Sequence, residues 1–312
     1  MSVPSILLIG AGGYLGGPVT VALLANRSRF NRIAILTEES KKQKFAEQEA
    51  KGFELIIGAF DSPGFDVVVS MLGNHAMKYQ PAIIDAAMTA GVTEFYPSEF
   101  GSDIGQGDYL TNRYWRDKHI TRQHLRDVAR KNPGFNYTFL VTGGFMEFAL
   151  HPLFGIDIEK HTFTFYGSPE KQEALTAVDD VAKYLVESVF LPKSPSQERT
   201  IRIPGGSYAW KDIIATLERV QGVNYACTYH PRQDAIDAQK AYAEKGDVDG
   251  ELAFSLKALM GDINTVSVPE PWDNDKFSFK PATFEETVRK FFEDLKRGED
   301  KLARNFPVSS QS

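Results

Sequence analysis

The chain has 312 residues, 42% of them hydrophobic and 24% charged, which is typical of a globular protein. A formal net charge of -6 argues against nucleic acid and anionic membranes as partners, because both are bound by basic surfaces. The single cysteine, Cys227, excludes an intramolecular disulfide and is expected to be an ordinary buried residue. With no signal peptide and no long apolar run, the chain is predicted to be cytoplasmic.

The first half of the chain alternates short apolar runs with helical patterns, which predicts a parallel sheet covered by helices. The expected strands are residues 5–9, 32–36, 53–57, 66–71, 94–96 and 137–141. The expected helices are residues 14–26, 41–51, 79–90 and 112–128. The SPGF connection at 62–65 is too short for a full crossover helix, so that helix is expected to be reduced or missing.

Beyond residue 141 the pattern is looser. Residues 161–166 alternate like an edge strand, and a second strand is expected at 199–203. Helices are expected at 178–190, 208–220 and 283–295. The last of these opens with Thr283 and Glu286 at the spacing of a capping box.

A glycine-rich turn, LLIGAGGYLGG, follows the first strand and places Gly10, Gly13 and Gly16 three residues apart. Glycines here permit a tight turn, let the backbone approach a pyrophosphate and direct helix N–H groups toward it. An ordinary strand–helix turn is the alternative, but the position after the first strand favours dinucleotide binding. Tyr14 and Leu15, inside the turn, are expected to contact the cofactor with the glycines.

The end of the second strand bears on the choice between NAD and NADP. Glu38 lies about 20 residues beyond the glycines, where an acid hydrogen-bonds the ribose 2′-hydroxyl and favours NAD. Lys41, Lys42 and Lys44 follow it. If Ser40 caps the next helix, the first two lysines oppose the helix dipole, and a bound 2′-phosphate would explain them. Solvation explains them equally well, so NADP(H) and NAD(H) both stay open at this point.

The helix expected at 112–128 has an inward stripe that contains a lysine. The stripe comprises Tyr114, Lys118, Thr121, Leu125 and Val128. The side expected to face solvent comprises Arg116, Asp117, Arg122, Gln123, Arg126 and Asp127. A lysine in such a stripe is either functional or extends its amine back to solvent.

The segment Tyr96–Gly101 (YPSEFG) resembles the PSEFG signature of the NmrA-like, isoflavone reductase-like branch of the atypical short-chain dehydrogenases. Besides the glycine turn, further segments match in order: Ser70–His75 (SMLGNH), Asp117–Lys118, Asn136–Phe145 (NYTFLVTGGF) and Asp179–Leu185 (DDVAKYL). The similarity covers most of the chain.

This resemblance implies a Rossmann-type doubly wound sheet over residues 1–155, with 176–205 returning to it. A smaller C-terminal α+β substrate lobe would take up 156–312. It also implies NADPH and the reduction of a C=O or conjugated C=C bond in an aromatic or polyketide-like secondary metabolite. The family lysine that matches Lys118 gives or accepts the proton, which would explain its inward position.

Other site residues follow from the same resemblance. Pro97 in the signature and Gly73 in SMLGNH are expected beside the cofactor, whereas Glu38 replaces the family's NADPH-reading arginine and puts 2′-phosphate selectivity in doubt. Tyr114 and Lys118 have the Tyr-x-x-x-Lys spacing of ordinary short-chain dehydrogenases, to which Ser98 would add a third catalytic member. The alternatives are a packed tyrosine ring and a serine that caps a turn.

Candidate substrate-binding residues are expected at the carboxyl side of the sheet and in the later segment. They are Trp115, Phe145, Met146, His151 and Tyr166. No metal site is expected, because the six histidines are scattered. The rival functions are a dinucleotide-binding redox sensor without turnover and a cofactor-binding isomerase or dehydratase. The protein is expected to be a monomer or a homodimer with a small-molecule substrate.

Overall fold

The computed structural model describes residues 3–58, 64–300 and 302. The chain divides into two compact units, each built from three segments of sequence. Unit 1 comprises residues 1–100, 117–141 and 179–201, and unit 2 comprises residues 101–116, 142–178 and 202–312.

Unit 1 is built on a seven-stranded sheet with the order β11-β6-β5-β4-β1-β2-β3. Neighbouring strands from β1 to β6 pair in parallel, and the order reverses between β1 and β4, as in a Rossmann sheet. The predicted α/β doubly wound fold is therefore confirmed. The strands are β1 (Ile6–Ile9), β2 (Ile33–Thr37), β3 (Glu54–Ile57), β4 (Val67–Ser70), β5 (Glu94–Tyr96), β6 (Asn136–Val141) and β11 (Glu198–Arg202).

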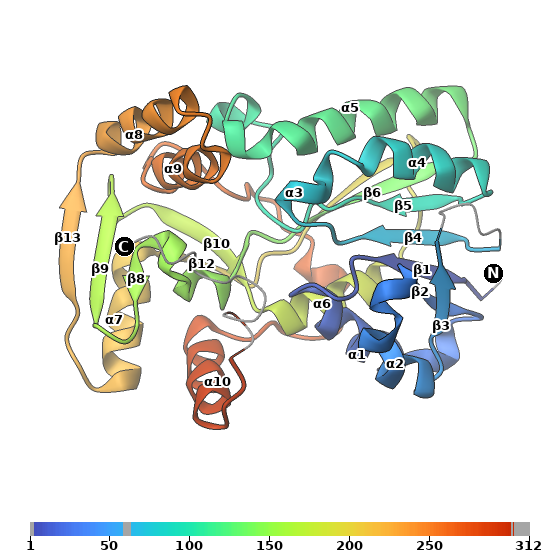
Figure 1. Cartoon of the computed structure of the whole chain (residues 1–312), viewed down its shortest axis with the longest axis horizontal. Coiled ribbons are helices and arrows are strands. Elements are labelled where there is room, and N and C mark those ends of the chain that lie inside the picture. The colour runs from blue at the N-terminus through green and yellow to red at the C-terminus, as the bar shows by residue number, and fades with distance from the viewer. Residues whose placement is uncertain (1–2, 59–63, 301, 303–312) are drawn as a thin grey trace. The chain divides into compact units, whose positions relative to one another are not determined.

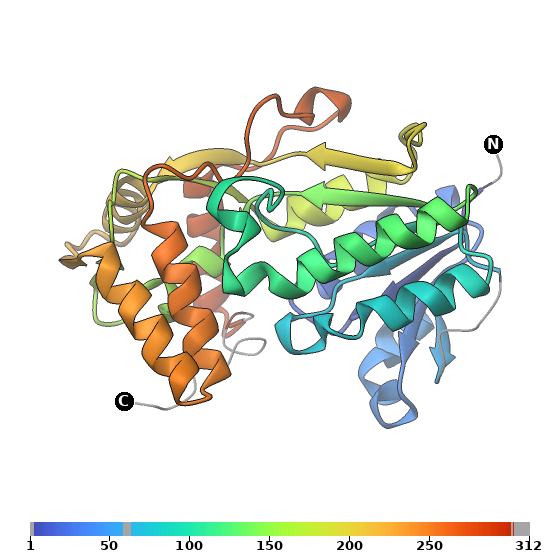
Figure 2. The ribbon, with the colours of Figure 1, turned by 90° about the horizontal axis from the view of Figure 1, so that it is seen from above.

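Helices cover both faces of this sheet (Figure 1). On one face α4 (Gln80–Thr89) and α5 (Arg116–Lys131) lie side by side, as Figure 2 shows from above. On the other face lie α1 (Gly16–Ala25) and α6 (Val178–Ser188). Every residue of β1 and β4 is buried, because a parallel strand covered on both faces has no solvent side.

Three predictions about local structure in the first half of the chain need correction. The helix expected at 41–51 is a 3-10 helix, Glu39–Phe45, followed by a short α2 (Ala46–Ala50). Ser40 does not cap it, because the helix already begins at Glu39. The helix expected at 112–128 is a 3-10 turn, Arg113–Trp115, followed by α5. The connection at 62–65 lies partly outside the described residues.

Unit 2 contains two three-stranded sheets, ordered β12-β10-β7 and β13-β9-β8. Their strands are β7 (Gly144–Phe145), β8 (Ile156–Asp157), β9 (Thr162–Tyr166), β10 (Gln172–Thr176), β12 (Gly206–Ala209) and β13 (Ala226–His230). The strand predicted at 161–166 is confirmed as β9, but its predicted edge position is wrong. It is the central strand of its sheet, because the later strand β13 pairs with its far side.

Helices complete unit 2, and two of them, α8 and α9, pack side by side (Figure 2). The helices are α7 (Trp210–Gln221), α8 (Arg232–Glu244), α9 (Val248–Met260) and α10 (Phe284–Lys296). The capping box of Thr283 and Glu286 is confirmed at the start of α10. Cys227 on β13 is exposed, contrary to the expected burial, because β13 is the outer strand of its sheet. Within the described ranges, no helix is long and apolar enough to cross a membrane.

Candidate functional site

The glycine turn joins the carboxyl end of β1 to helix α1. Gly10 has a φ of +82°, and a Cβ there would lie 2.7 Å from the carbonyl oxygen of Met71, at the end of β4. A Cβ on Gly16 would lie 2.3 Å from the carbonyl oxygen of Ala11. Both glycines are therefore required by close packing of the backbone. The turn lies where the strand order reverses, which is the ligand-binding edge of such sheets.

The remaining residues of the turn leave its outer side accessible. Gly13 is exposed, and a Cβ on Gly17 would meet no atom within 4 Å. Tyr14 is half-buried, and Leu15 is buried in the core, so only its backbone can face a ligand. An open glycine turn followed by a helix N-terminus suits a phosphate.

The cluster after β2 divides its lysines between two partners. Lys41 Nζ lies 3.0 Å from a carboxylate oxygen of Glu38, and this hydrogen bond lowers the pKa of Glu38. Lys44 Nζ donates a 2.8 Å hydrogen bond to the carbonyl oxygen of Gly12, inside the glycine turn. Lys42 is exposed. Sequence spacing does not reveal the Lys44 contact, which joins residues 32 positions apart.

The predicted inward position of Lys118 is confirmed: only 6% of the residue is exposed. Its Nζ donates a hydrogen bond to the backbone carbonyl of Glu99, in the PSEFG segment. Burial lowers the pKa of the Lys118 amine from 10.5 to about 8, opposed by the charge of Glu99 and assisted by that of Arg122. Burial thus brings the pKa of this amine closer to neutral pH than that of an exposed lysine.

Arg122 was predicted to face solvent, and that prediction is wrong. The residue is buried, and its guanidinium donates to both carboxylate oxygens of Glu99, at 3.0 and 2.8 Å. The acid comes from a loop 23 residues earlier, so the helical pattern alone does not show it. One signal was available: Lys118 and Arg122 are four residues apart and therefore share a face of α5.

Ser98 connects several elements of unit 1. Its hydroxyl donates a 2.6 Å hydrogen bond to the carbonyl of Leu72, after β4, and its N–H donates to the side-chain carbonyl of Gln80 on α4 at 2.8 Å. The Gln80 amide nitrogen in turn lies 3.3 Å from the hydroxyl of Thr121 on α5. Ser98 therefore connects the loops after β4 and β5 with each other and, through Gln80, with α4 and α5. Nothing in the sequence pattern points to this linking role of Gln80.

Two further predicted cofactor contacts lie in these loops. Pro97 is buried, and its carbonyl accepts a 2.7 Å hydrogen bond from the N–H of Glu99. Gly73 has an ordinary φ of -75°, and nothing lies within 4 Å of a Cβ built on it. Neither conformation nor packing within the chain therefore requires glycine at 73, and open space lies beside it.

Tyr114 and Trp115 lie in the 3-10 turn before α5 and belong to unit 2, whereas Lys118 belongs to unit 1. The Tyr114 N–H donates to the side-chain oxygen of Asn112 at 3.0 Å. The Tyr114 and Trp115 rings pack edge to face with centroids 4.7 Å apart. Tyr114 lies in the 3-10 turn that leads directly into α5, and its part in catalysis stays a prediction.

The other substrate candidates also belong to unit 2. Phe145 on β7 is half-buried, whereas Met146 is fully buried and its sulfur accepts a 3.3 Å hydrogen bond from the Thr287 hydroxyl. His151 Nδ1 accepts a 3.1 Å hydrogen bond from the N–H of Leu153, so this nitrogen serves as a local cap.

Tyr166 on β9 is half-buried and stacks on His230 of β13 with ring centroids 5.0 Å apart. It also packs edge to face with Phe254 of α9, with ring centroids 5.7 Å apart. These contacts hold the Tyr166 ring in place between β13 and α9.

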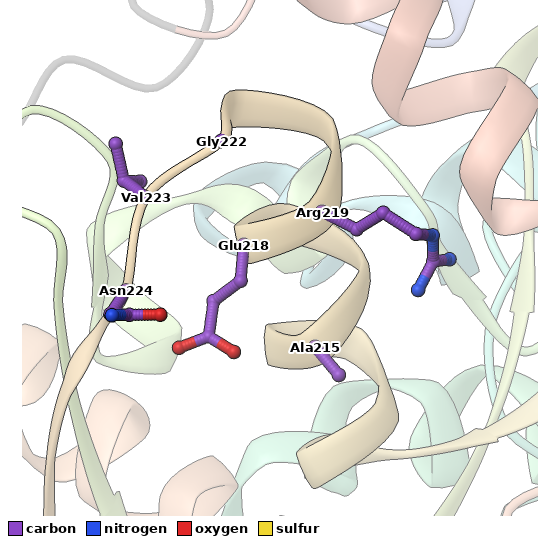
Figure 3. Close-up of a pocket in the computed structure, with 6 residues that line it drawn as sticks. All are labelled: Ala215, Glu218, Arg219, Gly222, Val223 and Asn224. Atoms are coloured by element: carbon purple, nitrogen blue, oxygen red, sulfur yellow. The ribbon is translucent and has the colours of Figure 1, made fainter.

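Two hollows in the described part of unit 2 are lined by none of the predicted site residues. A shallow hollow of about 380 Å³ lies along the C-terminal half of α7, beside Ala215, Glu218 and Asn224 (Figure 3). Another of about 200 Å³ lies between β10, β12 and residues 263–268. In the described part of the chain, no group of three or more His, Cys, Asp or Glu residues is arranged to hold a metal ion.

Comparison with known families shows to which family this chain belongs. Residues 3–287 match the NmrA-like family. The chain belongs to the NmrA-like family. The match includes the glycine turn, the PSEFG segment and Lys118, so the resemblance inferred from those residues is confirmed.

Individual relatives of this NmrA-like protein are named as oxidoreductases and reductases. It is 28% identical over 254 residues to an oxidoreductase of Aspergillus flavus, covering 78% of this chain and 83% of the relative. It is 23% identical over 253 residues to phenylcoumaran benzylic ether reductase 1 of Arabidopsis thaliana, covering 74% and 79%. The solved binary complex of leucoanthocyanidin reductase with NADPH, from Vitis vinifera, superposes with a TM-score of 0.74. The two share 18% identity over 92% of this chain and 98% of that chain, which supports the same fold.

Proposed function

We propose that this NmrA-like protein is an NADPH-dependent reductase of a small aromatic or polyketide-like molecule, with Lys118 as proton donor or acceptor. The observation that carries the proposal is the buried amine of Lys118 on α5, which is hydrogen-bonded to the PSEFG loop and has a pKa lowered to about 8. An acid–base group works best when its pKa lies near the operating pH. Relatives named as reductases, one of them acting on a benzylic ether, support this reaction class.

The glycine turn fits a nicotinamide dinucleotide, which when bound would supply the hydride. Gly10 and Gly16 shape the turn, and exposed Gly13 leaves the backbone open to a pyrophosphate. We infer a preference for the 2′-phosphate, because Glu38 is already paired with Lys41 and Lys44 brings a cation to the turn. The NADPH in the complex of leucoanthocyanidin reductase is consistent with this preference.

Lys118 can hold a proton at a fixed place. The Glu99 carbonyl accepts one N–H of the amine, so the other N–H bonds of the ammonium form point elsewhere. Below pH 8 the charged amine can give a proton to an oxygen that gains negative charge during reduction of a C=O or conjugated C=C bond. In the neutral form its lone pair can take the proton back. The roles of Tyr114, Ser98 and the substrate candidates of unit 2 stay predictions.

The decisive experiment is calorimetric titration with NADPH and with NADH, followed by NADPH consumption against a panel of aromatic ketones, enones and benzylic ethers. Tighter binding of NADPH and product that requires its oxidation are expected. Binding without turnover would favour a redox sensor, and product without net oxidation would favour an isomerase or dehydratase. If neither dinucleotide binds, the proposal is wrong.

A further inference from the structure

Glu99 is held at both ends by helix α5. Its backbone carbonyl accepts a hydrogen bond from Lys118, and its carboxylate accepts two from Arg122, one helical turn further on. The side chains of Arg122 and Glu99 are only 6% and 2% exposed. A bidentate pair so deeply buried has little freedom to rearrange, because breaking it would leave a charge in a dry environment.

The guanidinium of Arg122 is also fixed from the sheet side. Its central carbon lies 4.4 Å from the centre of the Phe139 ring, and Phe139 is a buried residue of β6. Arginine stacks well on an aromatic face, and its donors then lie in one plane. The sheet therefore orients Arg122, which in turn orients the carboxylate of Glu99.

We propose that Glu99 and Arg122 are positioning residues for Lys118: their ion pair fixes the PSEFG loop so that the Glu99 carbonyl holds the Lys118 amine in one place. A carbonyl accepts an N–H from either protonation state of the amine, so this position does not change when Lys118 gains or loses its proton. The proposal rests on the proposed function only for the use of that proton in catalysis.

The pair also sets how readily Lys118 is charged. Two ionisable groups act on its amine: Glu99 from the loop after β5 raises the pKa, and Arg122 from the same helix lowers it. Removing one charge leaves the other unbalanced. Glu99→Gln should therefore lower the pKa of Lys118, and Arg122→Met should raise it, each by about one pH unit. The opposite signs follow from the opposite charges of the two side chains, and the mobility of the Lys118 side chain reports the positioning role separately.

The test is an NMR titration of protein labelled with ¹³C at the lysine ε-carbon, with the Lys118 signal identified by its loss in Lys118→Met. The wild-type signal should titrate near pH 8. The pKa read from this signal should be lower in Glu99→Gln and higher in Arg122→Met. Relaxation of the same carbon reports position: Lys118 should become more mobile in Arg122→Met and in Arg122→Lys, which keeps the charge but loses the planar fork.

Unit 1 offers a matched control in the ion pair of Arg199 and Glu94, which is also buried, with 11% and 3% of the side chains exposed. Glu94→Gln should destabilise the fold without moving the pKa or the mobility of Lys118. The proposal would be overturned if Glu94→Gln changed the pKa and the mobility of Lys118 equally, or if the Glu99 and Arg122 variants changed neither. If Arg122→Met does not fold, Glu99→Gln and Arg122→Lys carry the test.

These measurements need no substrate and no turnover. A protein that binds dinucleotide without reducing anything would therefore leave the titration valid while disproving the reductase. Conversely, if the protein is an active reductase but the pKa of Lys118 is unchanged in the Glu99 and Arg122 variants, only the positioning role is disproved. The two failures are thus distinguishable.

Discussion

Two clusters in unit 1 combine a glutamate with cationic side chains, and their environments separate them. The side chains of Glu38 and Lys41 are 68% and 62% exposed, whereas those of Glu99 and Arg122 are 2% and 6% exposed. Water screens the first pair, so its members can exchange partners, for example with a ligand phosphate. The second pair is fixed by its own burial. A pair of opposite charges can thus serve as an adaptable recognition surface or as a rigid support.

The largest expected effect is on catalysis. Lys118→Met should lower kcat/KM by about 100- to 10,000-fold, because it removes the acid–base group of the buried cluster. NADPH binding, measured by calorimetry, should change far less. Lys131→Met, at the exposed end of the same helix, is the control and should keep full activity. A Lys118→Met variant with wild-type turnover would refute the assignment.

The next effect concerns stability and directly compares the two clusters. Arg122→Met should cost about 3–5 kcal/mol in the free energy of unfolding, because it leaves the Glu99 carboxylate buried and unpaired. Lys41→Met should leave the urea midpoint unchanged, since its partner is solvated. Urea denaturation of both variants provides the measurement. Similar midpoints for the two would show that burial does not separate the clusters.

The pH dependence of stability gives a third test. Between about pH 8 and 10.5 the unfolded lysine is protonated while the folded Lys118 is not, so the unfolded state binds more protons and stability rises with pH. The lowered pKa corresponds to about 3 kcal/mol across that range. Relative to Lys118→Met, the wild type should gain this amount on going from pH 8 to 10.5. A constant or falling difference in urea experiments would contradict the buried amine.

The smallest effect concerns cofactor choice at the exposed cluster. Lys44→Met should weaken NADPH binding about tenfold relative to NADH, a difference of about 1.4 kcal/mol, because it removes the cation beside the glycine turn. Lys42→Met, from the same exposed segment, is the control. Calorimetric dissociation constants for both cofactors decide the matter, and equal losses in the two variants would leave Lys44 without a specific role.

The sequence predicts the sheet of unit 1 well, because buried parallel strands are short apolar runs bounded by turns; the bounds of β5 agree to the residue. Unit 2 is predicted less well. Helices α8 and α9 carry only a weak apolar stripe and were not foreseen. The central position of β9 depends on its pairing with β13, which is distant in sequence. Strand β13 has no apolar pattern from which it could be predicted.

The same distinction holds for the candidate site. Gly10, Gly16 and Lys118 could be found from spacing and from the helical stripe, which are local properties. The burial of Arg122 could not, because it depends on a carboxylate from another segment, and neither could the contact of Lys44 with Gly12. Partners that are distant in sequence decide whether a charge is a surface group or part of a buried support.

We expect the side chain of Gln80 to slow the opening of the PSEFG loop. It accepts the N–H of Ser98 at one end and lies within hydrogen-bonding distance of Thr121 at the other, and it is completely buried. A glutamate of the same shape would lack the amide donor. Because the Ser98 N–H is bonded to buried Gln80, we expect its amide hydrogen to reach solvent when α4 and the loop separate. Exchange of this amide hydrogen with solvent is therefore expected to require the opening of a helix, which is slower and rarer than the fluctuation of a surface turn.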